Sequence, residues 1–136
     1  RMLARIDEVR PFPGAEDALG ALAGQGVELA LVTSNTRDAA RAVLGDTALR
    51  LFRHTHCGTA MFGKRFKLRE LLWTSRLTPA EIVCIGDEIR DAEAARAVGM
   101  DFIGVAWGYT HPAALQTCCD KPLVETFAQL HDMLAR

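Results

Sequence analysis

Short apolar runs alternate with helix-like patterns along this chain, and this alternation restricts its possible folds more than any other feature. The runs "VELALV", "IVCIG" and "DFIGVAWG" have the length and apolar content of buried strands. Strands that are separated by helices pair in parallel, and right-handed crossovers place the helices on both faces of the sheet. The sequence therefore predicts an α/β fold, a three-layer Rossmann-like parallel sheet with helices on both faces.

The expected helices share apolar residues at a spacing of three or four and a recognisable start or stop. They cover residues 11–26, 36–45, 64–77, 88–99 and 124–136. Gly45 and Gly99 mark the ends of two of them. "TPAE" at 78–81 carries a capping-box pattern. Because a strand-like run follows at once, only a brief turn is predicted there.

Composition excludes several classes of protein. The chain has 136 residues, of which 49% are hydrophobic and 24% charged, as in an ordinary one-domain soluble protein. Its formal net charge of -1 gives no electrostatic reason to expect a nucleic-acid partner, and no apolar stretch has the length of a membrane span. The cysteines lack metal-ligand spacing. A cytoplasmic protein with reduced thiols, and with neither nucleic-acid nor membrane partners, is predicted; oligomeric state is left open.

Two aspartates stand where a buried strand gives way to a helical pattern. Asp87 and Asp91 in "IGDEIRD" are four positions apart, so both carboxylates lie on one side of the first helical turn. Mg²⁺ takes one or two protein carboxylates and fills its other positions with water and phosphate oxygens. The simpler alternative is that acidic residues favour helix starts through the dipole alone. The strand directly before Asp87 favours a Mg²⁺ site at Asp87 and Asp91.

The run "LVTSN" ends a strand in three polar residues. The hydroxyl of Thr33 and the nearby amides of Ser34 and Asn35 can donate to a phosphate oxygen at the start of the next helix. Ser34 or Asn35 is also a suitable N-cap for that helix. Both roles are compatible. We therefore predict that these three residues bind a phosphate, with Thr33 facing the ligand and Asn35 capping the helix.

The loop "GTAMFGKR" at 58–65 fits the nucleotide-binding pattern GxxxxGK[ST] except at Arg65, where a magnesium-binding hydroxyl is required. The loop also contains bulky apolar residues, and it follows at least one strand and helix, whereas such loops normally follow the first strand of their domain. These facts oppose a nucleotide loop. Lys64 is then a lysine that serves phosphate chemistry of another kind.

Taken in order, "LVTSN", "GK" at 63–64 and "GDEIRDAEAARAVGM" resemble the haloacid dehalogenase-like hydrolases, in particular their phosphoglycolate phosphatase-like branch. The similarity covers nearly the whole chain. It implies that Thr33 holds the transferring phosphoryl group and that Lys64 neutralises the phosphate and the attacking carboxylate. It also implies that Asp87 is a metal ligand, with Asp91 as the partner carboxylate that fixes the metal's water shell or the lysine.

The sequence departs from the family pattern in two places. Arg65 replaces a proline that often follows the motif lysine, which makes Lys67 a second candidate for that lysine. The family's nucleophile motif, DxDx[TV], does not occur in the 136 residues. We therefore expect the nucleophile, its central strand and most of a cap domain to lie upstream. Residues 1–10 are then the end of the cap or its return linker, and 11–136 the part of the core after the cap.

The resemblance implies a Mg²⁺-dependent phosphatase of a small phosphorylated metabolite, phosphoglycolate being one candidate, which acts through an aspartyl-phosphate. This expectation concerns the full-length protein, and the 136 residues alone are expected to be inactive. One alternative is a non-catalytic relative that binds a phosphorylated ligand or a protein partner. The other is the nucleotide-binding loop considered above.

Overall fold

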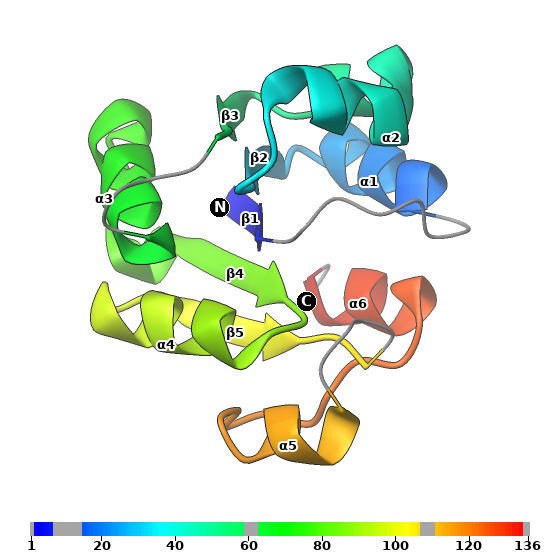
Figure 1. The fold of residues 1–136 in the computed structure, drawn as a ribbon. Helices are drawn as coiled ribbons and strands as arrows, with labels where there is room; N and C mark the ends of the chain where they lie inside the picture. Colours follow the sequence, from blue (N-terminus) through cyan, green and yellow to red (C-terminus); the bar gives the residue numbers. More distant parts are fainter. Residues whose placement is uncertain (1, 7–14, 59–62, 107–110, 135–136) are drawn as a thin grey trace.

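A parallel sheet of five strands forms the centre of the computed structural model, which describes residues 2–6, 15–58, 63–106 and 111–134 (Figure 1). The strands, in the order in which they lie side by side, are β3 (His54–His56), β2 (Glu28–Val32), β1 (Met2–Ile6), β4 (Ile82–Gly86) and β5 (Asp101–Gly104). The helices are α1 (Ala15–Gly24), α2 (Arg37–Arg50), α3 (Lys64–Ser75), α4 (Ile89–Ala97), α5 (Pro112–Gln116) and α6 (Phe127–Leu134). A short 3₁₀ helix, η1 (Pro79–Glu81), leads into β4.

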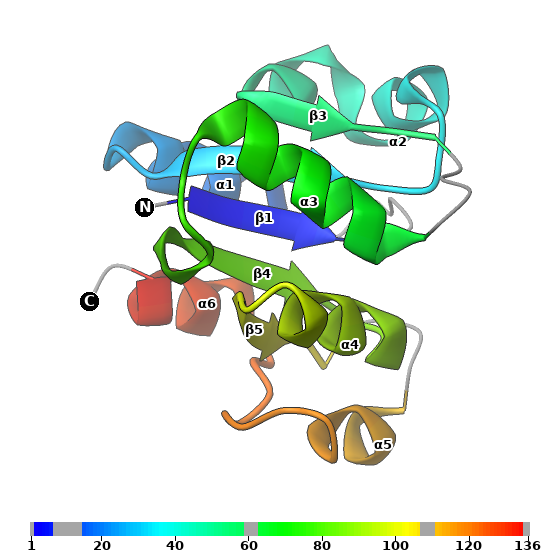
Figure 2. The ribbon, with the colours of Figure 1, turned by 90° about the vertical axis from the view of Figure 1, so that its left-hand side faces the viewer.

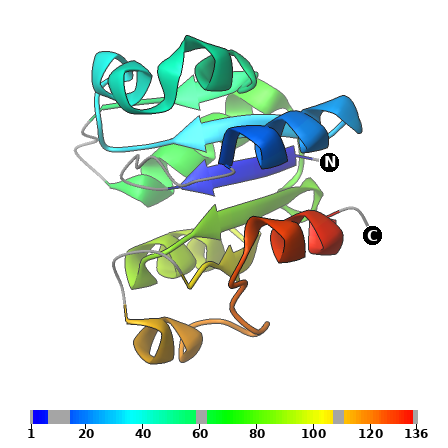
Figure 3. The same ribbon diagram turned by 90° about the vertical axis from the view of Figure 1, so that its right-hand side faces the viewer.

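The helices cover both faces of this sheet. Figure 2 shows α3 and α4 in front of one face, and Figure 3 shows α1 and α6 in front of the other, with α2 at the upper edge of the sheet. Strand pairing is parallel at every step of the described sheet. The predicted three-layer α/β architecture is therefore confirmed.

Successive side chains of a strand point to opposite faces of the sheet, so each face has its own buried apolar cluster. Leu3 joins α1, α2 and α6 in one buried cluster, while Met2 and Ala4 join α3 and α4 in the other. Leu22 and Leu71, which are both almost fully buried, are examples of the helix side chains that complete the two clusters. Each such leucine contributes about 1.5–3 kcal/mol through burial. Both faces are apolar because a parallel sheet is covered on both sides.

The structure differs from the sequence analysis at the centre of the sheet. We expected an upstream strand in this position, whereas β1 occupies it and pairs with both β2 and β4. A strand here satisfies two sets of main-chain groups that otherwise face solvent as open edges. We missed β1 because its apolar run is short and is interrupted by Arg5. That residues 1–10 belong to a cap or linker in the full-length protein stays a prediction, because residues 1 and 7–10 lie outside the described residues.

Smaller differences concern the ends of helices. Gly45 does not end α2, since a kink at φ 83° and ψ 161° joins a further helical segment that continues to Arg50. The predicted turn at 78–81 is confirmed, because Glu81 Oε1 accepts hydrogen bonds from the main-chain nitrogen and the hydroxyl of Thr78, both at 3.0 Å. Strand β3 and helix α5 were not predicted, because their sequences are short and lack a clear period.

No helix in the described part of the chain combines the length and the hydropathy that crossing a membrane requires. The four cysteines are free thiols, and Cys84 is buried in β4, as its apolar surroundings in the sequence indicate.

Candidate functional site

The carboxyl ends of the central strands bring two of the predicted site residues to one edge of the sheet. Ile6 at the end of β1 pairs with Val32 on one side and with Gly86 on the other. Thr33 and Asp87 each follow directly after these partners. Because neighbouring strands lie about 4.8 Å apart, the backbones of Thr33 and Asp87 lie about 10 Å apart across the end of β1. In open α/β sheets this is the edge where ligands bind.

Three carboxylates gather at the turn between β4 and α4. Asp87, Glu88 and Asp91 each offer one oxygen, and these three oxygens lie within 4.8 Å of one another. Asp87 and Asp91 are both buried, with 6% and 0% of their surface exposed. Carboxylate oxygens are the hard ligands that Mg²⁺ prefers. The donor set therefore fits a divalent cation of this type, and it includes Glu88, to which the sequence analysis gave no role.

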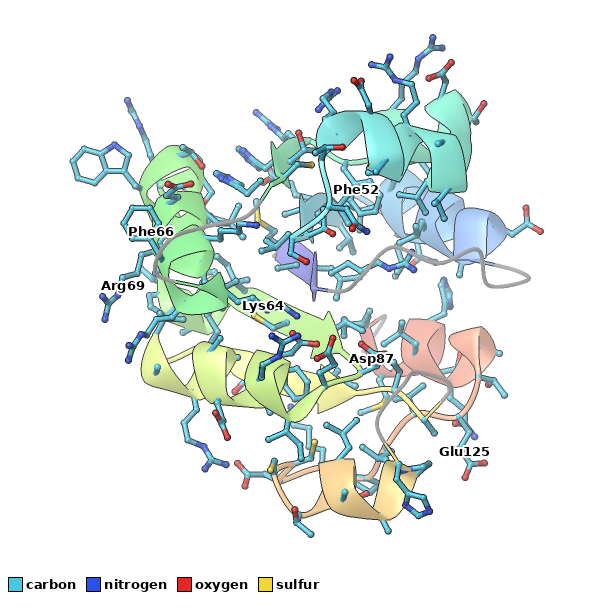
Figure 4. The ribbon with its side chains drawn as sticks, viewed as in Figure 1. Phe52, Lys64, Phe66, Arg69, Asp87 and Glu125 are labelled. Atoms are coloured by element: carbon cyan, nitrogen blue, oxygen red, sulfur yellow. The ribbon has the colours of Figure 1, made fainter. Side chains whose placement is uncertain are left out.

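Lys64 reaches this cluster from the first residue of α3 (Figure 4). Its Nζ lies 2.5 Å from Asp91 Oδ1 and 3.8 Å from Glu88 Oε1. Gly63 precedes the helix with φ 80°, a backbone conformation that glycine adopts without steric cost. The loop residues 59–62 lie outside the described residues. The predicted convergence of Lys64 with Asp91 and the strand end at Asp87 is present in the structure.

Asp91 is held from two directions. Its Oδ1 accepts from Lys64, and its Oδ2 accepts from the main-chain nitrogen of Glu88 at 3.2 Å. Burial raises the pKa of Asp91 from 3.8 to about 6, against the opposing effect of the Lys64 charge. The low polarity that surrounds this carboxylate disfavours its ionised form more than its bonds favour it.

The raised pKa of Asp91 predicts a specific pH dependence for the metal-free protein. Between pH 4 and 6 the native state retains a proton that the unfolded state has lost, so the free energy of unfolding falls as the pH rises through this window. The expected loss is about 3 kcal/mol by pH 7. Asp91→Asn removes this dependence. Denaturant unfolding with a chelator present, at pH 4 to 7, should show that the wild type loses stability relative to the variant; parallel curves would contradict the prediction.

Gly86 leaves space for the Asp91 carboxylate. A Cβ atom at this position would lie 2.6 Å from Asp91 Oδ2, which is too close for any side chain. We expect Gly86→Ala to displace Asp91 and to lower the free energy of unfolding by about 1–3 kcal/mol, the usual cost of overpacking. Thermal unfolding measures the second effect, and calorimetric Mg²⁺ titration of the full-length protein measures the first. Gly20→Ala in α1, where a Cβ meets no atom within 4 Å, is the matched control.

Thr33 is fully buried at the end of β2. Its hydroxyl accepts a hydrogen bond from the main-chain nitrogen of Asn35 at 3.1 Å, and its carbonyl oxygen accepts one from Lys67 Nζ at 2.6 Å. Ser34 is exposed beside it. The helix cap is neither Ser34 nor Asn35, which corrects the sequence analysis. Thr36 caps α2, because its hydroxyl accepts from the main-chain nitrogen of Ala39 at 3.1 Å.

The sequence analysis underestimated the part of Lys67 in this site, as it did that of Glu88. It was considered as a substitute for Lys64, but the structure gives the two lysines different contacts, since Lys64 bonds to carboxylates and Lys67 to main-chain carbonyls. The signal was present in the sequence. Lys67 stands at helical spacing from Leu71, on the stripe of α3 that faces the core.

Comparison with known proteins identifies the family of this chain. Residues 2–105 match the family model described as haloacid dehalogenase-like hydrolase. The phosphoglycolate phosphatase of Synechococcus elongatus is 37% identical over 120 residues, which cover 88% of this chain and 57% of that protein. The phosphoglycolate phosphatase of Agrobacterium fabrum is 33% identical over 122 residues, which cover 87% and 48%. The chain thus spans about half the length of these curated relatives.

A solved structure gives the same result for the fold. A hydrolase of the haloacid dehalogenase-like family from Streptococcus pneumoniae superposes with a TM-score of 0.82 at 20% identity, over 92% of this chain and 60% of that one. The family match covers most of the chain. This chain belongs to the haloacid dehalogenase-like hydrolases.

Proposed function

We propose that the full-length protein is a Mg²⁺-dependent phosphatase that hydrolyses the phosphoric monoester of a small metabolite. The observation that carries this proposal is the contact of Lys64 with Asp91, beside Asp87 at the end of β4. An ammonium next to hard oxygen ligands suits phosphoryl transfer, in which catalysis is mainly positioning and charge stabilisation. The two phosphoglycolate phosphatases to which the chain is similar make phosphoglycolate the first substrate to test.

The carboxylates divide the work of holding a cation. Both oxygens of Asp91 already accept hydrogen bonds, from Lys64 and from the Glu88 main chain. We therefore assign direct coordination to Asp87 first, and to Asp91 and Glu88 the orientation of Lys64 and of the water around the ion. When bound, Mg²⁺ neutralises charge on the phosphoryl oxygens.

The remaining residues act on the phosphoryl group. A carboxylate oxygen forms a bond to phosphorus as the ester oxygen leaves as the alcohol, with a proton from a general acid, and water then hydrolyses the aspartyl-phosphate to inorganic phosphate and the free carboxylate. Lys64 lowers the repulsion between the attacking carboxylate and the phosphate. The Thr33 hydroxyl and the Ser34 amide hold the phosphoryl oxygens, and the Asn35 amide, predicted to bind phosphate as well, instead orients the Thr33 hydroxyl to which it donates. We assign the nucleophile to a DxDx[TV] motif outside these 136 residues, and in the full-length protein its strand would take the place between β2 and β4 that β1 holds in this structure.

Phosphate release from a panel of phosphorylated metabolites tests this function. The full-length protein should release phosphate with Mg²⁺ and none with a chelator, and phosphoglycolate should be among the best substrates. The 136 residues alone should release none. Turnover by the 136 residues would contradict our account of the nucleophile and would direct attention to Asp7, the first acidic residue in the sequence after β1.

The alternatives make different predictions in the same experiment. A full-length protein that binds phosphorylated ligands without releasing phosphate would favour the non-catalytic relative. Nucleotide binding that disappears with Lys64→Ala would favour the nucleotide loop. The contacts of Lys64 oppose this last interpretation, because its ammonium is bonded to a carboxylate, and β3, after which the loop comes, lies at one end of the described sheet.

A further inference from the structure

Lys67 is a buried cation inside the predominantly apolar interface between α3 and the sheet. Only 5% of its surface is exposed, and its neighbour Leu68 and Leu71 on the next turn are fully buried. Charged groups are seldom buried unless they are paired, because the loss of hydration is costly. Burial accordingly lowers the pKa of Lys67. A methionine or leucine would fill this position at less cost, so the lysine calls for a reason other than packing.

The ammonium of Lys67 joins two loops at the carboxyl edge of the sheet. It donates to the carbonyl oxygen of Thr33, which directly follows β2, at 2.6 Å, and it also donates to the carbonyl oxygen of Gly58, which follows β3. Hydrogen bonds from a charged donor are stronger than neutral ones. The same two loops share a bond from the main-chain nitrogen of Gly58 to the carbonyl oxygen of Asn35 at 2.7 Å.

This bridge connects the phosphate-binding residues of the proposed site. Lys67 lies one helical turn after Lys64, so the two lysines extend from the same side of α3. One end of the turn is fixed to Asp91 through Lys64, and the other is fixed to Thr33 through Lys67. The geometry therefore couples the position of Lys64 to that of Thr33.

We propose that Lys67 is a positioning residue of the phosphatase site, which fixes Thr33 and the Gly58 loop relative to Lys64. This inference rests on the proposed function. Lys67 acts through its two carbonyl partners and need not touch the substrate. A displacement of about 1 Å in such a site costs up to about 100-fold in rate, so a residue that only aligns others has a large effect on turnover.

Three variants of the full-length protein test the proposal. Lys67→Met keeps the length and apolar stem but removes the donors, whereas Lys67→Arg keeps a charged donor. Arg69→Met removes a charge from the exposed side of the same helix, where Figure 4 shows Arg69 directed away from the sheet. We expect Lys67→Met to lower kcat about 10- to 100-fold with less than a threefold change in KM. Lys67→Arg should regain at least a third of that loss of kcat on a logarithmic scale. Arg69→Met should have the kcat and KM of the wild type.

The folded fraction of each variant is measured by circular dichroism at the assay temperature. A Lys67→Met variant that keeps the wild-type kcat would overturn the proposal. So would a loss of kcat that equals the loss of folded protein, or one that Lys67→Arg does not reduce, because these results indicate packing alone.

A measurement without turnover separates this proposal from the proposed function. The Gly58 amide should exchange its hydrogen at least tenfold faster in Lys67→Met than in the wild type. The amides of β4 should exchange at the wild-type rate in Lys67→Met, and the Gly58 amide should do so in Arg69→Met. If no substrate is hydrolysed but Gly58 responds in this way, the function fails and the bridge stands. If phosphate is released while Gly58 exchange and kcat do not change in Lys67→Met, the function stands and the positioning role fails.

Discussion

Asp87→Asn should reduce phosphate release by the full-length protein by about 1,000-fold or more. Asp87 is the buried carboxylate directly after β4, and it is the residue to which we assign direct coordination of Mg²⁺. Asparagine keeps the size but removes the negative charge, so the cation loses its principal ligand and the transition state loses the stabilisation of that cation. Losses of about 100- to 1,000-fold follow the removal of one neutral donor in comparable sites, and the loss of a charged ligand is expected to be at least as large.

Initial rates at saturating substrate over a range of Mg²⁺ concentrations measure this effect. Calorimetric titration with Mg²⁺ measures the ligand role independently and should show at least tenfold weaker binding. Asp101→Asn is the matched control, since Asp101 is an exposed aspartate at the first residue of β5, where the amino ends of the strands lie, away from the site at their carboxyl ends. Equal activity of Asp87→Asn and Asp101→Asn would rule out the metal site that we assign.

Lys64→Met should lower kcat about 100- to 1,000-fold, a loss of the size seen when one group that stabilises developing charge is removed. The variant also has a structural consequence, because the charge of Lys64 offsets part of the rise in the pKa of Asp91 that burial causes. Without this charge the pKa of Asp91 rises further. The pH dependence of stability in the metal-free variant should therefore extend to higher pH than in the wild type.

Arg65→Met provides the control for Lys64→Met, because Arg65 is the exposed next residue of the same helix. Phosphate release as a function of pH, with denaturant unfolding of the same samples, gives both results. If Arg65→Met loses as much activity as Lys64→Met, the general basic charge of this segment matters and the specific contact to Asp91 does not.

The order of motifs in the sequence predicted where the site would form, because parallel strands that are joined by helices end at the same edge. Thr33 and Asp87 follow β2 and β4, the two strands that pair with β1, for this reason. Lys64 contacts Asp91, which is one of the two roles that the family resemblance implied for this carboxylate. The roles of these residues in catalysis stay predictions. The location of the site could be predicted because the polar residues "TSN" and "GD" mark the ends of two strands clearly.

The parts that could not be predicted depend on contacts between distant segments. The position of β1 is fixed by open hydrogen-bonding edges on β2 and β4, and a run with Arg5 in it carries no strong strand pattern of its own. The contacts of Lys67 with Thr33 and Gly58 depend on how α3 packs across two strands. Glu88 was missed for a local reason, since the backbone of the turn after Asp87 determines the direction of its side chain.

The position of β1 has a consequence for the order in which the sheet assembles. Met2 pairs with Glu28 in β2 and with Ile82 in β4, and the second partner is about three times as far along the chain. The loop-closure entropy for the pairing with β4 is then greater by about 1 kcal/mol. Local contacts form before distant ones when topology limits the folding rate. The pairing of β1 with β4, which aligns Thr33 with Asp87, is therefore expected to form last. The site then takes shape only at the end of folding.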